Sequence, residues 1–130
     1  MAPKLIENWH AVVVSKNIAD MKALLADDVV FQSPVVHTPQ QGKAITSAYL
    51  TAALHVLNNE SFHYLNQWYG EKSAVLEFET VVDGITINGV DIIEWNEANL
   101  ITNFKVMVRP LKAMNHLHAM MGAMLMKMKG

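Results

Sequence analysis

The change from helical to strand periodicity near residue 60 is the feature that most constrains this fold. Between residues 61 and 109, apolar and polar side chains alternate, which is the pattern of half-buried strands. The alternation is interrupted at Asp83-Gly84, a strong hairpin signal, and again at 96–99. The pattern therefore predicts an antiparallel meander of four strands, at 61–69, 74–82, 85–95 and 100–109.

Helices are predicted on both sides of this meander. Asn17 is a candidate N-cap of the second helix, with Asp20 three residues later. A short strand is predicted at 29–31, and a loop should follow it at Ser33-Pro34. Apolar side chains recur at helical spacing in four segments, at 4–16, 18–26, 43–58 and about 111–128. This order predicts an α+β fold, in which three N-terminal helices pack on a curved antiparallel sheet and a fourth helix follows it.

Length and composition narrow the class of protein. The 130 residues fit one domain, spanning 1–130, and the absence of cysteine excludes disulfides and thiolate nucleophiles. A net charge of −2 argues against a nucleic-acid partner. Without a long apolar run or the apolar core of a signal peptide, we expect a cytoplasmic protein with no membrane partner. The 52% hydrophobic content indicates a hydrophobic pocket or a buried subunit interface.

Two segments resemble a known superfamily. LLADDVVFQSP followed by a glycine-led helix, and GVDIIEWNEANLITNFKV within the meander, are similar to the nuclear transport factor 2-like superfamily. The resemblance covers residues 5–109 and points to its SnoaL-like members, the relatives of polyketide cyclases and ketosteroid isomerases. It implies a cone-shaped α+β barrel that admits a small hydrophobic molecule. It also implies a homodimer formed through the convex face of the sheet.

Asp91 is the most informative candidate residue. Strand alternation places it among apolar neighbours on the face that the helices cover, where an unpaired carboxylate is costly and its pKa rises. The resemblance implies that Asp91 matches the neutral aspartic acid of ketosteroid isomerases, Trp9 their oxyanion-binding tyrosine and Ser33 their basic aspartate. Indole cannot exchange a proton and serine is no base unaided, so that chemistry is not expected unchanged. Alternatively, Asp91 is a structural anchor, hydrogen-bonded to Trp9 or to another helix residue.

Two histidines near the predicted cavity differ in their expected roles. His37 follows Pro34 in a loop and is a candidate acid or base at the cavity mouth, together with Asp91. The alternative is an exposed loop histidine. His10 is expected on the exposed side of the first helix, away from Trp9.

Apolar and aromatic side chains should surround Asp91. Tyrosines there can provide an apolar wall together with one hydroxyl, although the same residues also suit ordinary core packing. The candidate ligand-binding residues are Trp9, Ser33, Tyr49, Phe62, Tyr64, Phe78, Ile93, Phe104 and Val106.

Several chemistries are not expected. The six histidines show no metal-ligand spacing and no glycine-rich phosphate loop occurs, so neither a metal nor a cofactor is predicted. Epoxide hydrolysis in this superfamily needs an arginine two residues before Asp91, where this chain has Gly89. Arg109, the only arginine, is expected to pair with a glutamate of the convex face or to orient an acidic ligand. Apolar residues predicted on that face are Leu65, Ile101 and Met107.

The methionine-rich C-terminal helix has three possible roles. Its apolar stripe runs along Leu111, Met114, Leu117, Met121, Met124 and Met128. It can pack on its own domain or on a partner subunit, act as a mobile lid, or lie on a membrane.

We therefore expect a protein that binds a small hydrophobic ligand and isomerises, cyclises or hydrolyses it without a metal. Asp91 and Trp9 would contact its polar atom, and His37 would move a proton. The alternative is a noncatalytic homodimeric interaction module or ligand carrier.

Overall fold

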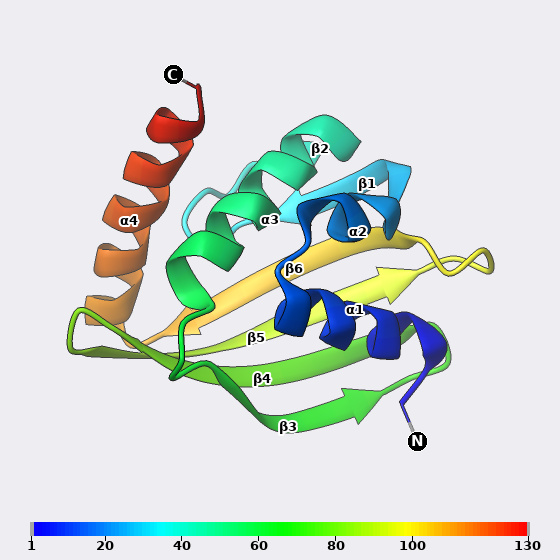
Figure 1. Cartoon of the computed structure of the whole chain (residues 1–130), viewed down its shortest axis with the longest axis horizontal. Coiled ribbons are helices and arrows are strands. Elements are labelled where there is room, and N and C mark those ends of the chain that lie inside the picture. The colour runs from blue at the N-terminus through cyan, green and yellow to red at the C-terminus, as the bar shows by residue number, and fades with distance from the viewer. Residues whose placement is uncertain (1, 130) are drawn as a thin grey trace.

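The structure, a computed structural model, describes residues 2–129 and the side chains of residues 2–128. Figure 1 shows α1, α2 and α3 across one side of a curved sheet, with α4 standing at one end. This α+β arrangement confirms the predicted fold class. The elements are α1 (Lys4–Ser15), α2 (Ile18–Ala23), β1 (Leu25–Gln32), β2 (Gln40–Gln41), α3 (Lys43–Leu57), β3 (His63–Tyr69), β4 (Ser73–Val82), β5 (Ile85–Trp95), β6 (Ile101–Arg109) and α4 (Leu111–Lys129).

The six strands form one sheet in the order β2-β1-β6-β5-β4-β3. Strands β3 to β6 make the predicted antiparallel meander, while β1 runs parallel to β6. Within the described residues, the edge strands β2 and β3 do not pair with each other. The predicted barrel is therefore a curved sheet that remains open.

Two predictions about the N-terminal half were wrong. The second helix ends at Ala23 rather than at residue 26, and β1 begins at Leu25 rather than at residue 29. Leu25 pairs with Ile101 of β6, and this long-range strand pairing overrides the local helical pattern. The loop after Pro34 also contains the short strand β2, which pairs with β1. The N-cap prediction is confirmed, because the Asn17 side chain accepts a hydrogen bond from the Asp20 N–H.

The alternation of buried residues along the central strands follows the prediction closely, with one exception. Leu76 of β4, Asp91 of β5 and Val106 of β6 lie side by side on the face beneath the helices. Ile101 was predicted on the convex face but is fully buried. A register shift between Glu94 and Trp95 brings Ile101 opposite Trp95 and turns it inward.

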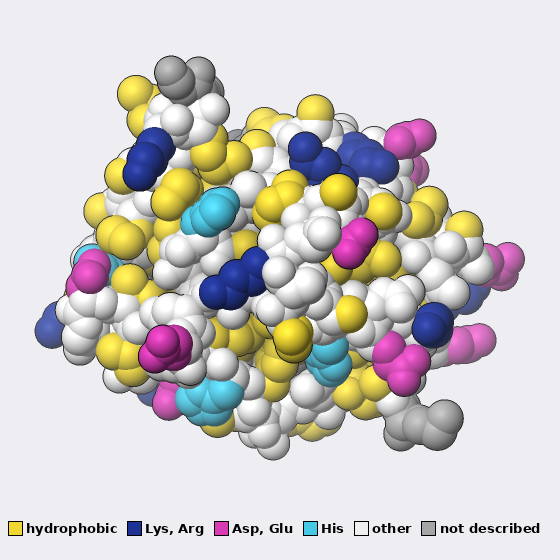
Figure 2. Space-filling view, in the orientation of Figure 1, with side chains coloured by type: hydrophobic (Ala, Val, Ile, Leu, Met, Phe, Trp, Pro, Cys, Tyr) yellow, Lys and Arg dark blue, Asp and Glu magenta, His cyan; other side chains and the backbone are white. Residues whose placement is uncertain are grey.

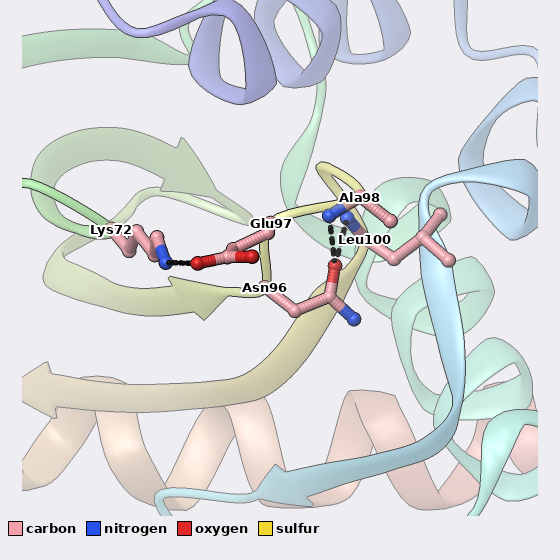
Figure 3. Close-up of polar contacts among 5 residues, drawn as sticks. All are labelled: Lys72, Asn96, Glu97, Ala98 and Leu100. Atoms are coloured by element: carbon pink, nitrogen blue, oxygen red, sulfur yellow. Dashed lines mark hydrogen bonds and ion pairs between the residues drawn. The ribbon is translucent and has the colours of Figure 1, made fainter.

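The turn between β5 and β6 is held by local polar contacts. The Asn96 side chain accepts hydrogen bonds from the N–H groups of Ala98 and Leu100, at 2.9 and 3.1 Å (Figure 3). Lys72, before β4, forms an ion pair of 3.0 Å with Glu97 of this turn. Because both charged groups are well exposed, the Asn96 bonds define the turn more than the ion pair does.

The C-terminal helix packs on its own domain. Ala113 and Leu117 of α4 are buried in a core cluster with Phe78 and Ile87 of the sheet. The predicted stripe was wrong at both ends, since Leu111 is 74% and Met128 42% exposed, and Ala113 is buried instead. Figure 2 shows hydrophobic side chains on the outer surface of α4 as well. Among the described residues, no helix combines the length and the apolar character needed to cross a membrane.

Gly89 is required by the packing of two neighbouring strands. It lies on the inward face of β5, opposite Phe78 of β4. A Cβ at this position would lie 2.5 Å from Phe78 Cζ and 2.9 Å from the Met107 carbonyl oxygen. The epoxide-hydrolase pattern has an arginine at the position of Gly89. In this structure the Phe78 ring fills the space that a side chain at position 89 would occupy.

We expect Gly89→Ala to lower the free energy of unfolding by about 1–3 kcal/mol, because Phe78 must move to admit the methyl group. Urea denaturation measures this change. Gly122→Ala, in α4, is the matched control, since nothing lies within 4 Å of its added Cβ. An equally stable Gly89→Ala protein would contradict the close approach of Phe78.

Candidate functional site

A cavity of about 170 Å³ lies between the helices and the inward face of the sheet. Its wall is almost entirely apolar, and it reaches the surface beside the exposed residues Val36 and Gly122. Most of the candidate residues proposed from the sequence line it: Trp9, Ser33, Tyr49, Phe62, Tyr64, Phe78, Asp91, Phe104 and Val106.

Two candidate residues lie outside the described lining. Ile93 is fully buried in the core cluster formed with α1 and β1. His37 is exposed in the loop after Pro34, one residue beyond Val36, which does line the cavity. Ser33 lines the cavity, but its hydroxyl accepts a hydrogen bond of 3.0 Å from the Val35 N–H. The Ser33 hydroxyl therefore stabilises the turn at the mouth of the cavity.

Asp91 places a carboxyl group in this apolar wall. Asp91 is 8% exposed and lies between Leu76 and Val106 of the neighbouring strands. Burial raises the pKa of Asp91 from 3.8 to about 7, and no hydrogen bond from a described residue offsets that cost. The alternative role of Asp91, as an anchor hydrogen-bonded to Trp9 or to another helix residue, is not supported by any hydrogen bond among the described residues. Both protonation states of Asp91 are therefore accessible near neutral pH.

Trp9 contacts Tyr64 instead of Asp91. The indole Nε1–H donates a hydrogen bond of 3.2 Å to the Tyr64 hydroxyl oxygen. Burial above all, and then the negative charge of Asp91, raise the pKa of Tyr64, while the bond from Trp9 lowers it. Tyr64 thus stays protonated, and because its oxygen accepts from Trp9, its own proton remains available to an acceptor in the cavity.

His10 was predicted to be exposed, and this was wrong. Its ring packs on that of Tyr64, with the centroids 5.2 Å apart, and the residue is half-buried. The Nε2 atom is buried without a hydrogen-bond partner among the described residues. The helix α1 lies over the edge of the sheet, so this side of the helix faces β3 rather than solvent.

Sequence reasoning missed His118, which α4 brings to the cavity together with Met121 and Leu125. The methionine stripe predicted an apolar face for α4 but could not show what that face would cover. His116, two residues earlier, instead contacts Asp83 of the β4–β5 hairpin at 2.9 Å.

Arg109 is exposed on the convex side of the sheet. Its charge helps to lower the pKa of Glu77, although hydrogen bonds from Asn66 and Asn88 lower it more. No ion pair of Arg109 within 4 Å is found among the described residues. No group of three or more histidine, aspartate or glutamate side chains that could hold a metal ion occurs within residues 2–128.

An open curved sheet that faces three helices across an apolar cavity is the architecture of nuclear transport factor 2-like proteins. The chain belongs to the SnoaL-like domain family, whose model matches residues 6–104.

Two solved structures are similar over nearly the whole chain. A steroid delta-isomerase from Pseudomonas aeruginosa is 32% identical with a TM-score of 0.89, over 95% of this chain and 90% of that one. An uncharacterised protein with a cystatin-like fold from Silicibacter pomeroyi is also 32% identical, with a TM-score of 0.85, over 92% of this chain and 84% of that one. A nuclear transport factor 2-like protein of unknown function from Mesorhizobium loti shares the fold at 14% identity, with a TM-score of 0.70, over 82% of this chain and 89% of that one. The search of curated proteins found no match.

The raised pKa of Asp91 predicts a pH-dependent stability. Between about pH 4 and pH 7 the carboxyl is ionised in the unfolded chain but protonated in the folded one, so stability falls as pH rises through this window. Asp91→Asn removes the buried charge. We expect it to be more stable than the parent by about 4 kcal/mol at pH 8 or so, with a much smaller difference near pH 4.

Urea denaturation at several pH values measures this difference. Asp28→Asn, at an exposed carboxyl of β1, is the control and should follow the parent profile. A parent protein that gains stability, relative to Asp91→Asn, as pH rises through this window would contradict the shift.

Proposed function

We propose that this protein binds a small hydrophobic carbonyl compound in the cavity and moves a proton on it, as an isomerase or a cyclase does. The observation that carries this proposal is Asp91, a buried carboxyl without a described hydrogen-bond partner, which lines the same apolar cavity as Tyr64 and whose charge acts on the Tyr64 hydroxyl. Such an unpaired group lowers stability, and no structural contact explains it.

The two polar groups suit the two demands of this chemistry. A pKa near the working pH lets the Asp91 carboxylate remove a proton from the carbon next to the carbonyl, and the resulting acid return it to another carbon. The oxygen of the ligand becomes negative in between, and a hydrogen bond donated by Tyr64 stabilises it. Trp9 holds the Tyr64 hydroxyl in place. His37, near the mouth, remains a candidate for exchanging that proton with solvent.

Steroid isomerisation is the second candidate, favoured by the similarity to the steroid delta-isomerase. Two observations argue against a steroid substrate. Ser33 stands where the resemblance places the basic aspartate of ketosteroid isomerases. The cavity of about 170 Å³ is close in size to the ~150 Å³ cavity that holds benzene in a known case. One ring therefore fits without rearrangement, whereas four fused rings require α4 or the mouth loop to move.

We expect the protein to speed the exchange of the methyl-ketone protons of acetophenone, a one-ring ketone, for deuterium, which NMR follows directly. Asp91→Asn and Tyr64→Phe should each reduce this rate about 100-fold or more. Tyr69→Phe is the control, because Tyr69 is exposed and its hydroxyl donates a hydrogen bond to Gln67, and neither residue lines the cavity. Binding of the ketone without faster exchange would favour the noncatalytic carrier.

We also propose that the protein forms a homodimer through the convex face of the sheet. Large apolar side chains are exposed there, with Met107 at 52% and Trp68 at 55%. The partly exposed Val75 and Ile92 continue this surface across β4 and β5. Apolar surface of this kind, bordered by Glu79 and Lys105, is typical of the centre and rim of a subunit interface.

Met107→Glu should convert the dimer to a monomer, because it places a charge in the apolar centre of the interface. Native mass spectrometry distinguishes the two states. Val14→Glu is the matched control, since Val14 is exposed on α1 and far from this face. A parent protein that is monomeric at micromolar concentration would overturn the proposal.

A further inference from the structure

The described lining of the cavity has one residue that can be negatively charged at neutral pH and one that can be positively charged, on different elements of the fold. Among the described lining residues, Asp91 is the only side chain that can carry a full negative charge at neutral pH, and His118 is the only one that can carry a positive charge. Asp91 lies in the middle of the sheet, whereas His118 is exposed on α4, where the cavity reaches the surface. From this separation we infer that the ligand carries a carboxylate, which His118 binds at the mouth while the carbonyl oxygen lies at Tyr64.

His118 is available for such a contact. Among residues 2–128 it has no hydrogen bond or ion pair, whereas His116 on the same helix is held by Asp83. The sequence contains no aspartate or glutamate after Glu97, so α4 carries no acid that would compete for the imidazole. A histidine in this setting is a free hydrogen-bond donor, and it becomes a cation when protonated.

Charge also determines the orientation of the ligand. A carboxylate beside Asp91 would lose its hydration at any pH, and it would also meet a like charge whenever Asp91 is ionised; both effects oppose binding there. The same carboxylate at His118 remains partly hydrated and gains an opposite charge. This inference rests on the proposed function, and it limits the substrate to hydrophobic oxo acids whose two polar groups lie at opposite ends.

The test compares two probes of matched shape by isothermal titration calorimetry at slightly acidic pH. One probe is 4-acetylbenzoic acid, whose acetyl and carboxyl groups lie at opposite ends of a single ring, and the other is its methyl ester. We expect the acid to bind the parent protein roughly two- to fivefold more tightly than the ester, as for a partly exposed ion pair. In His118→Gln the ratio of the two affinities should fall to about one.

His116→Gln is the matched control, because it removes a histidine from the same helix outside the cavity, and its affinity ratio should match the parent's. Equal affinities for acid and ester in the parent, or a preference that survives in His118→Gln, would overturn the role of His118. In either case binding of the ester leaves the proposed function standing. If neither probe binds, the proposed function fails, and this inference fails with it.

Discussion

The antiparallel pairing of β4, β5 and β6 decides which side chains the helices cover. It aligns Leu76, Asp91 and Val106 in one row across the sheet, so that the same ladder that buries two apolar side chains also buries a carboxyl group. A slip of one residue would turn Asp91 to solvent, but it would also carry Glu94 and its outward neighbours into the core. The apolar pattern of three strands thus outweighs the desolvation of a single acid.

Among the described residues, no side chain donates a hydrogen bond to the Asp91 carboxyl group in the apolar cavity. Trp9, the donor that the sequence analysis proposed for Asp91, is hydrogen-bonded to Tyr64 instead. The Ser33 hydroxyl accepts a hydrogen bond from the turn that follows it. The carboxyl group is left with burial as its only strong influence, and its pKa rises to about 7. Proteins retain such destabilising groups where activity requires them, which is the physical basis of the role proposed for Asp91.

Much of the candidate site could be predicted because strand alternation decides which residues share a face. That rule correctly brought Phe78, Asp91, Phe104 and Val106 to one cavity. It failed at Ile101, where a register shift adds one residue to β6 and reverses the expected side. It also had no means of finding His118, because the position of a helix relative to a sheet depends on packing between distant segments rather than on local periodicity.

Local periodicity and turn chemistry were enough to predict the fold class, the hairpin at Asp83-Gly84 and the burial of Asp91. Only the folded structure shows that Trp9 bonds Tyr64, that His10 of α1 packs on the Tyr64 ring, and that α4 lines the cavity. Those contacts join residues far apart in the chain. Their geometry depends on how the helices pack on the curved sheet, and a local sequence pattern does not predict that packing.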